Sequence, residues 1–242
     1  MSYTYQIAAD VNVPTDGSGT YLCTPDAYTI EVHEMGLCST NPIQSQNWVK
    51  SANNVVLWTK GSGSALTADV APGKVIANPP VVQQPPLGSY NYSYVLLKNE
   101  IIQKTKAEFK DGTFYSLSNK DASSSSTEYA AYTESLLNLS DISGIWTPYI
   151  NDTDFATQGL LLKSDKATTA TDDTEVPYIL GVFDKTANPI NVARVVRGSQ
   201  RLSIKYLTTN RVGIWCDNWA SPGPDTNFVF GSLPFIFRVT IS

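Results

Sequence analysis

Charged residues are scarce in this sequence, and those present do not gather by sign. Asp, Glu, Lys and Arg make up 16% of the 242 residues, against about 25% in typical globular domains. The net charge is −5, whereas binding to a phosphate backbone needs clustered cations. We therefore expect no nucleic-acid partner. The densest basic stretch alternates with carboxylates: Lys98, Glu100, Lys104, Lys106, Glu108, Lys110 and Asp111.

Long apolar runs are also missing from the sequence. No stretch of about 18 apolar residues occurs, so the sequence predicts no membrane-spanning helix and no membrane partner. The opening residues, MSYTYQIAAD, contain neither a basic segment nor the apolar run of a secretory leader. We therefore expect no Sec signal peptide in this chain.

Histidine occurs once, and this limits the catalytic options. A serine or cysteine triad would have to use His33 as its base. Strand alternation places His33 with Glu31 on the polar side, so we expect a solvent-facing residue that is dispensable. No G-x-S-x-G elbow, phosphate loop or dinucleotide-binding glycine pattern occurs. The sequence thus predicts a protein that is not an enzyme and that binds no cofactor.

Cysteine is nearly as rare, with Cys23, Cys38 and Cys216 as its only occurrences. An odd number leaves at least one thiol free. Cys23 and Cys38 could bridge neighbouring strands, which would stabilise the fold by about 3 kcal/mol in the loop-entropy model. The alternative is three reduced cysteines. No C-x-x-C spacing occurs, so we expect no zinc site.

Short segments rich in Val, Ile, Tyr, Thr and Phe, separated by turn residues, fill most of the chain, as is typical of β-strands. Tyr28, Ile30 and Val32 alternate with polar neighbours, as in a strand with one wet face. No amphipathic helices separate these segments, which favours a sandwich over βαβ units. The sequence therefore predicts an all-β fold, an antiparallel β-sandwich of jelly-roll type with long loops and at most one short helix. The expected strands are residues 3–8, 28–37, 55–58, 94–97, 100–109, 113–117, 159–163, 178–183, 191–196, 201–208, 211–216 and 235–241.

Two hairpins are expected in the middle of the chain. In the first, Lys98 and Asn99 join the runs on either side of them. In the second, Lys110, Asp111 and Gly112 turn the chain into residues 113–117, and Asp-Gly between β-prone runs is a strong hairpin signal.

The one helix that we expect follows the second hairpin. Large side chains recur there at helical spacing, and a hydroxyl residue precedes them as a possible cap. The residues concerned are Ser126 or Thr127 as the cap and Tyr129, Tyr132, Leu136 and Leu139 as the buried stripe.

Proline and glycine concentrate in residues 60–93 and break any long element there. Pro-Pro pairs favour extended chain, and an excursion of this length usually makes contacts. The segment is either an arm that crosses a neighbouring subunit or a meander folded on its own domain. We expect one domain over residues 1–242, with a two-part split near residues 78–90 as the alternative. The candidate contact residues are Pro79, Pro80, Pro85 and Pro86.

Two loops carry the remaining candidate sites. Asp152 and Asp154 begin a calcium-like loop that lacks the central Gly and distal Glu, and they are the only metal ligands that we single out. Trp215 and Trp219 flank two polar residues, Asp217 and Asn218. Aromatic rings stack on sugars and also dominate protein interfaces. Three interpretations therefore stay open for this group: core residues, a subunit interface, or a sugar site.

The final apolar run, residues 235–241, is expected to be an integral strand. Its residues alternate at period two, with Phe235, Phe237, Val239 and Ile241 on one face. Burial of four such side chains is worth about 6–12 kcal/mol of transfer free energy. A tail of this kind needs a cover, either from its own domain or from another subunit.

One stretch resembles a known group of proteins. The segment YLCTPDAYTIEV, continued by GLCSTNP up to Pro42, is similar to the openings of virion structural proteins of marine phages. The resemblance covers about 20 residues and implies a non-enzymatic subunit of an extracellular particle: capsid, decoration or tail. Its implied partners are itself, as a homo-oligomer, and other virion proteins at the virion surface. The alternative is a carbohydrate-binding or adhesin module that contacts surface glycans.

Overall fold

The structure is a computed structural model that describes residues 5–14, 19–45, 47–50, 54–72, 85–135, 157–171, 175–192, 202–216, 228–232 and 236–241. Over these residues the chain is all-β, as the sequence predicts, and its regular structure consists of strands and two single-turn 3-10 helices. The sheets are antiparallel except where β1 (Tyr5–Ile7) pairs in parallel with β2 (Thr20–Cys23).

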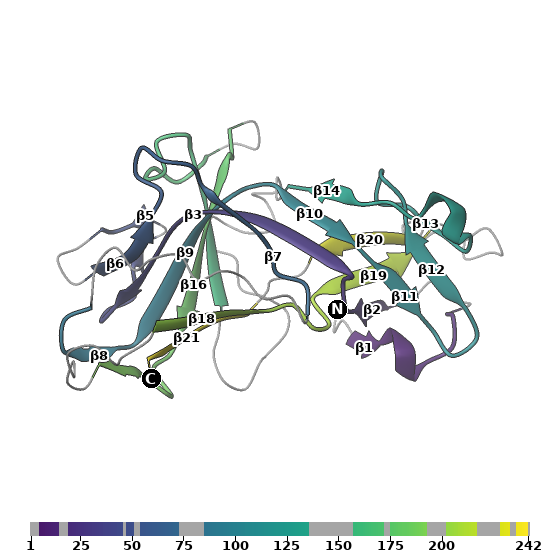
Figure 1. Ribbon diagram of the computed structural model, residues 1–242, viewed down its shortest axis with the longest axis horizontal. Coiled ribbons are helices and arrows are strands. Elements are labelled where there is room, and N and C mark those ends of the chain that lie inside the picture. Colours follow the sequence, from purple (N-terminus) through teal and green to yellow (C-terminus); the bar gives the residue numbers. More distant parts are fainter. Residues whose placement is uncertain are drawn as a thin grey trace.

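The fold is organised around β3 (Ala27–Cys38), a strand of 12 residues that is paired along both edges. Along one edge lie β6 (Asn54–Thr59) and then β7 (Leu66–Asp69). Along the other edge lie β9 (Tyr92–Lys98) and then β10 (Ile101–Lys104). In Figure 1, β3 runs from the strands around β9 and β16 to those around β10 and β14. It therefore belongs to both ends of the molecule.

The hairpin expected at Lys98 and Asn99 is wrong. β9 and β10 both run antiparallel to β3 and follow one another along the same edge of it. The link between them is thus a local excursion from one nearly continuous strand, and the chain does not reverse there. The second expected hairpin is confirmed, because β11 (Lys106–Glu108) pairs with β12 (Thr113–Ser116) across the Asp111–Gly112 turn.

The main sheet continues beyond β9 and is buried on both faces. Followed from one hydrogen-bonded neighbour to the next, its strands are β14-β10-β3-β9-β16-β15. Here β14 spans Tyr132–Glu134, β15 spans Thr157–Leu162 and β16 spans Tyr178–Asp184. One face contributes Ile30, Val32 and Phe183 to a core that also includes Tyr90 and Val192. The opposite face carries a second apolar cluster, which comprises Cys38, Ile43, Trp48, Tyr94, Leu96, Leu160, Leu162, Leu180 and Val182.

A smaller sheet of order β1-β2-β19-β20 forms the other end of the molecule (Figure 1). β19 (Val212–Cys216) and β20 (Phe228–Ser232) come from the last part of the chain and pair with strands from its beginning. The inner face of this sheet packs on the β11–β12–β13 sheet, with β13 spanning Ala122–Ser123. This third core contains Tyr21, Cys23, Ala107, Phe109, Tyr132, Val212, Ile214, Phe228 and Phe230.

Three short ladders complete the described structure. They are β8 (Gly88–Tyr90) with β17 (Ile190–Val192), β18 (Leu202–Leu207) with β21 (Ile236–Ile241), and β4 (Ile43–Gln44) with β5 (Asn47–Trp48). The β18–β21 ladder confirms that the C-terminal run is a strand with a partner from its own chain. Its six residue pairs extend from Leu202 opposite Ile241 to Leu207 opposite Ile236.

The expected helix after residue 126 is wrong where the chain is described. A single 3-10 turn, η2 (Ser126–Glu128), is capped by the Ser125 hydroxyl, and the chain then extends into β14. Tyr132 is buried because it faces the third core from a strand, so its spacing from Tyr129 is not that of a helical stripe. Leu136 and Leu139 lie outside the described residues.

The proline- and glycine-rich segment belongs in part to the main core. Its residues 66–69 form β7, and Val70, Ala71 and Tyr90 are buried in the same cluster as β3. These portions are therefore folded on their own domain and are not an arm, whereas residues 73–84 lie outside the described residues. Ala68, which precedes positions 78–90, and Ile190, which follows them, are buried in this same core.

Gly36, near the end of β3, leaves room for the ring of Tyr94, which crosses it. A methyl group there would lie 2.3 Å from the Val55 carbonyl oxygen and 2.5 Å from Cε1 of Tyr94. We expect Gly36→Ala to lower the free energy of unfolding by about 1–3 kcal/mol, the usual cost of overpacking. Chemical denaturation measures this difference. Gly88→Ala is the matched control, since a methyl group at Gly88 has nothing within 4 Å. Equal stability of the two variants would contradict the assigned packing.

Candidate functional site

The structure places only some of the residues singled out from the sequence. Trp215 lies in β19, Pro85 is buried, and Pro86 is exposed and accepts a hydrogen bond of 2.9 Å from the Tyr90 hydroxyl. Of the two candidate tryptophans, the structure thus describes Trp215 alone. The other candidates lie outside the described residues: Pro79, Pro80, Asp152, Asp154, Asp217, Asn218 and Trp219.

Trp215 belongs to the outer face of the β1-β2-β19-β20 sheet. Strand residues alternate between faces, and in β19 Val212 and Ile214 are buried in the third core while Trp215 is half-buried on the other side. Cross-strand pairing defines which residues share that side. We call this surface the Trp215 face, and the residues of the four strands that the structure describes in full on it are Ile7, Thr20, Leu22, Gly213, Trp215, Val229 and Gly231.

The Trp215 indole lies over a strip of backbone that has no side chains. Gly213 and Gly231 are cross-strand partners. A methyl group on Gly231 would lie 2.1 Å from Cη2 of Trp215, and one on Gly213 would lie 3.4 Å from Cε3. The two glycines therefore create the space in which the indole rests. The ring forms part of the surface and is not a core residue.

The rest of the Trp215 face is apolar. Ile7 is 40% exposed, and Leu22 and Val229 are half-buried. An antiparallel sheet with one face in the core normally presents polar residues on its other face. Within the four strands, among the side chains that the structure describes on this face, Thr20 alone is polar, and the exposed Asp121 lies at the sheet edge, where it is bridged to Val229. The sheet is therefore apolar on both sides.

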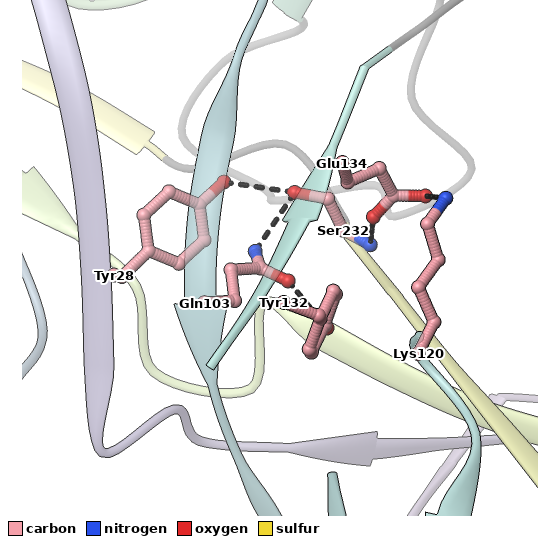
Figure 2. A network of polar contacts seen from close by, with 6 residues as sticks. All are labelled: Tyr28, Gln103, Lys120, Tyr132, Glu134 and Ser232. Carbon is pink, nitrogen blue, oxygen red and sulfur yellow. Dashed lines mark hydrogen bonds and ion pairs between the residues drawn. The ribbon is translucent and has the colours of Figure 1, made fainter. Parts of the chain in front are cut away.

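Beneath this sheet, a buried polar network joins β20 to the main sheet (Figure 2). The Ser232 hydroxyl accepts a hydrogen bond of 2.8 Å from Nε2 of Gln103 and lies 3.1 Å from the Tyr28 hydroxyl. The Tyr132 hydroxyl donates to Oε1 of Gln103 at 2.6 Å. Burial raises the pKa of both tyrosines, which keeps them protonated as donors. The network fixes the end of β20 against β3, β10 and β14.

Glu134 extends the network at the end of β14. Its carboxylate accepts a hydrogen bond from the Ser232 backbone N–H and lies 3.6 Å from Nζ of Lys120 (Figure 2). Burial raises the pKa of Glu134, and Lys120 together with the amide opposes the shift. The serine hydroxyl contacts a tyrosine and a glutamine, neither of which acts as a base near neutral pH. The arrangement therefore serves to join the two sheets and does not activate a nucleophile.

The prediction that His33 faces solvent is wrong. His33 is 4% exposed, and its Nε2 lies 2.8 Å from a carboxylate oxygen of Glu31. Alternation does place His33 on the same side as Glu31, but this side is covered: the Tyr178 ring, which packs against the second apolar cluster, meets the imidazole edge-on with centroids 5.0 Å apart. His33 is also the extra residue of a β-bulge, because Val32 pairs with Leu97 and Glu34 with the preceding Leu96.

The cysteine alternative of a Cys23–Cys38 bridge is also wrong, because both thiols are free and lie in different cores. Burial raises the pKa of each to about 12. Both are therefore unreactive thiols near neutral pH. The side chain of Cys216 lies outside the described residues.

The described ranges hold no group of three His, Cys, Asp or Glu side chains that could bind a metal ion. In the same part of the chain, no helix is long and apolar enough to cross a bilayer. No protein-family model matches the sequence, and no curated protein or solved structure matches it either. The Trp215 face is thus the candidate functional site among the described residues.

Sequence reasoning found Trp215 but missed the surface around it. The signal that could have found it is the pattern of small and large residues in Val212–Cys216, where Gly213 and Trp215 alternate with apolar residues. The polar network left no such signal. Gln103 and Glu134 look like ordinary exposed strand residues until the pairing of distant strands buries them.

The network predicts a large difference between two tyrosine substitutions. Tyr132→Phe leaves the buried Oε1 of Gln103 without its donor, so we expect a loss of about 1–3 kcal/mol in the free energy of unfolding. Tyr129→Phe is the control. It removes a hydrogen bond of 2.5 Å to Asp26 at the surface and should cost about 0.5 kcal/mol or less. Chemical denaturation compares the two variants. Equal losses in the free energy of unfolding would show that the network stabilises the fold no more than the surface hydrogen bond does.

Proposed function

We propose that this protein is a non-enzymatic structural subunit of an extracellular assembly, such as a capsid, decoration or tail component of a virion. The observation that carries the proposal is the Trp215 face. A sheet whose inner side already fills a core has no need of apolar residues on its outer side, unless that side is covered in the working state.

The partner that we propose for this face is a second copy of the chain. Subunits of a particle meet through repeated contacts between identical or related surfaces. Within the four strands, the described side chains of the Trp215 face carry no charge, and Asp121 lies at its edge opposite Val229, so two copies could meet at the centre of this face without burying an unpaired charge. The large, nearly flat indole of Trp215 is the type of side chain that dominates such contacts.

The resemblance to marine-phage structural proteins supports the same proposal from another part of the chain. The similar residues, 21–42, include β3 and most of β2, and β2 is itself a strand of the sheet that carries the Trp215 face. The residues that carry the resemblance thus form the structural centre of the fold, which is what a subunit that is mainly scaffold would share with others of its kind.

A carbohydrate-binding module is the alternative, and the exposed part of the Trp215 indole favours it. A sugar site also needs carboxylates or amides beside the ring to bind the hydroxyl groups. The described neighbours of the indole on its face are Leu22, Val229 and Thr20, which offer a single hydroxyl group. This composition favours a protein contact over a sugar contact.

Ile7 and Ile102 form a matched pair for testing the proposed interface. Ile7 is 40% exposed on the Trp215 face, and Ile102 is 42% exposed on β10, where its cross-strand partners are Thr29 and Thr133. Ile7→Lys introduces a charge into the proposed contact. We expect it to weaken self-association at least about tenfold, or about 1.4 kcal/mol, whereas Ile102→Lys should leave it unchanged.

Sedimentation velocity over a concentration series measures both variants and the parent protein. Equal self-association of the two variants, or a parent protein that stays monomeric at every concentration, would contradict the proposal. A glycan array on the same samples tests the alternative. Saturable binding to an oligosaccharide that Trp215→Ala abolishes would favour the sugar-binding function.

A further inference from the structure

The lone histidine occupies an unusual position in the central strand. His33 is the extra residue of the β3 bulge, so its backbone is released from the regular ladder with β9. Its carbonyl oxygen instead accepts a hydrogen bond of 2.9 Å from the Lys60 backbone N–H, where the chain leaves β6. The bulge therefore holds the start of the loop that links β6 to β7.

The two nitrogens of the His33 ring have different environments. Nε2 lies 2.8 Å from Oε1 of Glu31, a side chain that is 34% exposed. An ionised carboxylate accepts hydrogen bonds, so Nε2 carries the proton of the neutral ring and donates it. Nδ1 is buried and has no hydrogen-bond partner among the described residues. A proton taken up from solution therefore binds at Nδ1, inside the protein.

Cations surround this position from two other elements. Lys60 follows β6, and Lys166 belongs to the turn after β15, with its Nζ 4.9 Å from the ring centre of Tyr178 in β16. The Tyr178 ring in turn meets the His33 ring edge-on, with centroids 5.0 Å apart. Burial lowers the pKa of His33; Glu31 opposes this shift, and Lys166 and Lys60 add to it.

Two further charged groups lie near Glu31. Lys98, the last residue of β9, forms an ion pair with Glu100 on the link to β10, and Lys98 also interacts with Glu31 and Tyr178. The carboxylate that compensates an imidazolium at His33 is therefore shared with a lysine. Protonation adds a positive charge to a buried ring that already experiences the charges of Lys60 and Lys166.

We propose that His33 is a built-in acid sensor whose protonation at Nδ1 opens the β3 bulge and releases the β6–β7 loop at Lys60. Below the ordinary pKa of histidine, about 6.5, the unfolded or opened chain binds a proton that the closed structure resists. The closed structure is therefore favoured above this pH and is progressively lost as the pH falls toward the lowered pKa of the folded state. The opening lets the imidazolium reach water.

A single histidine makes the first measurement direct, because its ring gives one set of NMR signals. We expect the His33 imidazole of the intact protein to titrate below pH 6.5, and we expect the Lys60 amide to exchange at least tenfold faster at pH 5 than at pH 7.5, after correction for the intrinsic pH dependence of exchange. The Phe109 amide, which donates to the Gly112 carbonyl in the β11–β12 turn, is the internal control and should not change.

The variant His33→Gln separates this sensor from general acid effects. Glutamine does not titrate, so the tenfold acceleration at Lys60 should disappear while the exchange at pH 7.5 stays close to that of the parent. If this variant fails to fold, Glu31→Gln tests the same contact, because loss of the carboxylate should lower the histidine titration further. A parent His33 that titrates at 6.5 or above, a Lys60 amide indifferent to pH, or an acid response retained in His33→Gln overturns the proposal.

Discussion

Double-edged pairing of β3 is the constraint on which the rest of the structure depends. A strand of 12 residues with both edges filled must be matched on each side by chain running antiparallel to it, and here two successive segments supply each side. The same strand reaches all of the important contacts. Tyr28, near its start, belongs to the polar network with Ser232. His33 is the buried extra residue of its bulge, and Gly36, near its end, leaves space for the ring of Tyr94.

Much of the fold could be predicted from the sequence, because strand-sized apolar runs and turn residues act locally. The strands, the Asp111–Gly112 hairpin and the C-terminal strand are of this kind. The wrong predictions concern places where pairing with residues far away in the sequence determines the structure. Lys98 and Asn99 resemble a hairpin link, but β9 and β10 both pair with the same edge of β3 and continue along it in one direction. The spacing of Tyr129 and Tyr132 suggests a helix, yet pairing with β10 extends the chain.

The candidate site divides in the same way. Trp215 could be singled out without a structure, because it is a large aromatic residue close to Asp217, Asn218 and a second tryptophan, Trp219. That it rests on Gly213 and Gly231 depends on the register between β19 and β20, which sequence alone does not reveal. The exposure of His33 was misjudged for a related reason. Alternation gives the side on which His33 lies, but it does not show that Tyr178, from a strand far away in the sequence, covers that side.

The small sheet has a consequence for how the protein is made. β2 and its partner β19 are far apart in the sequence, so Cys23 meets Val212 only after all the residues between them have been synthesised. Ribosomes release residues at about 5–20 per second. The edge of β2 therefore waits for many seconds with its backbone groups unpaired, next to apolar residues that have no core yet. Contacts between such distant residues also slow folding. An unpaired strand edge beside apolar residues is the feature that promotes aggregation, so this interval is when the chain is most exposed to it.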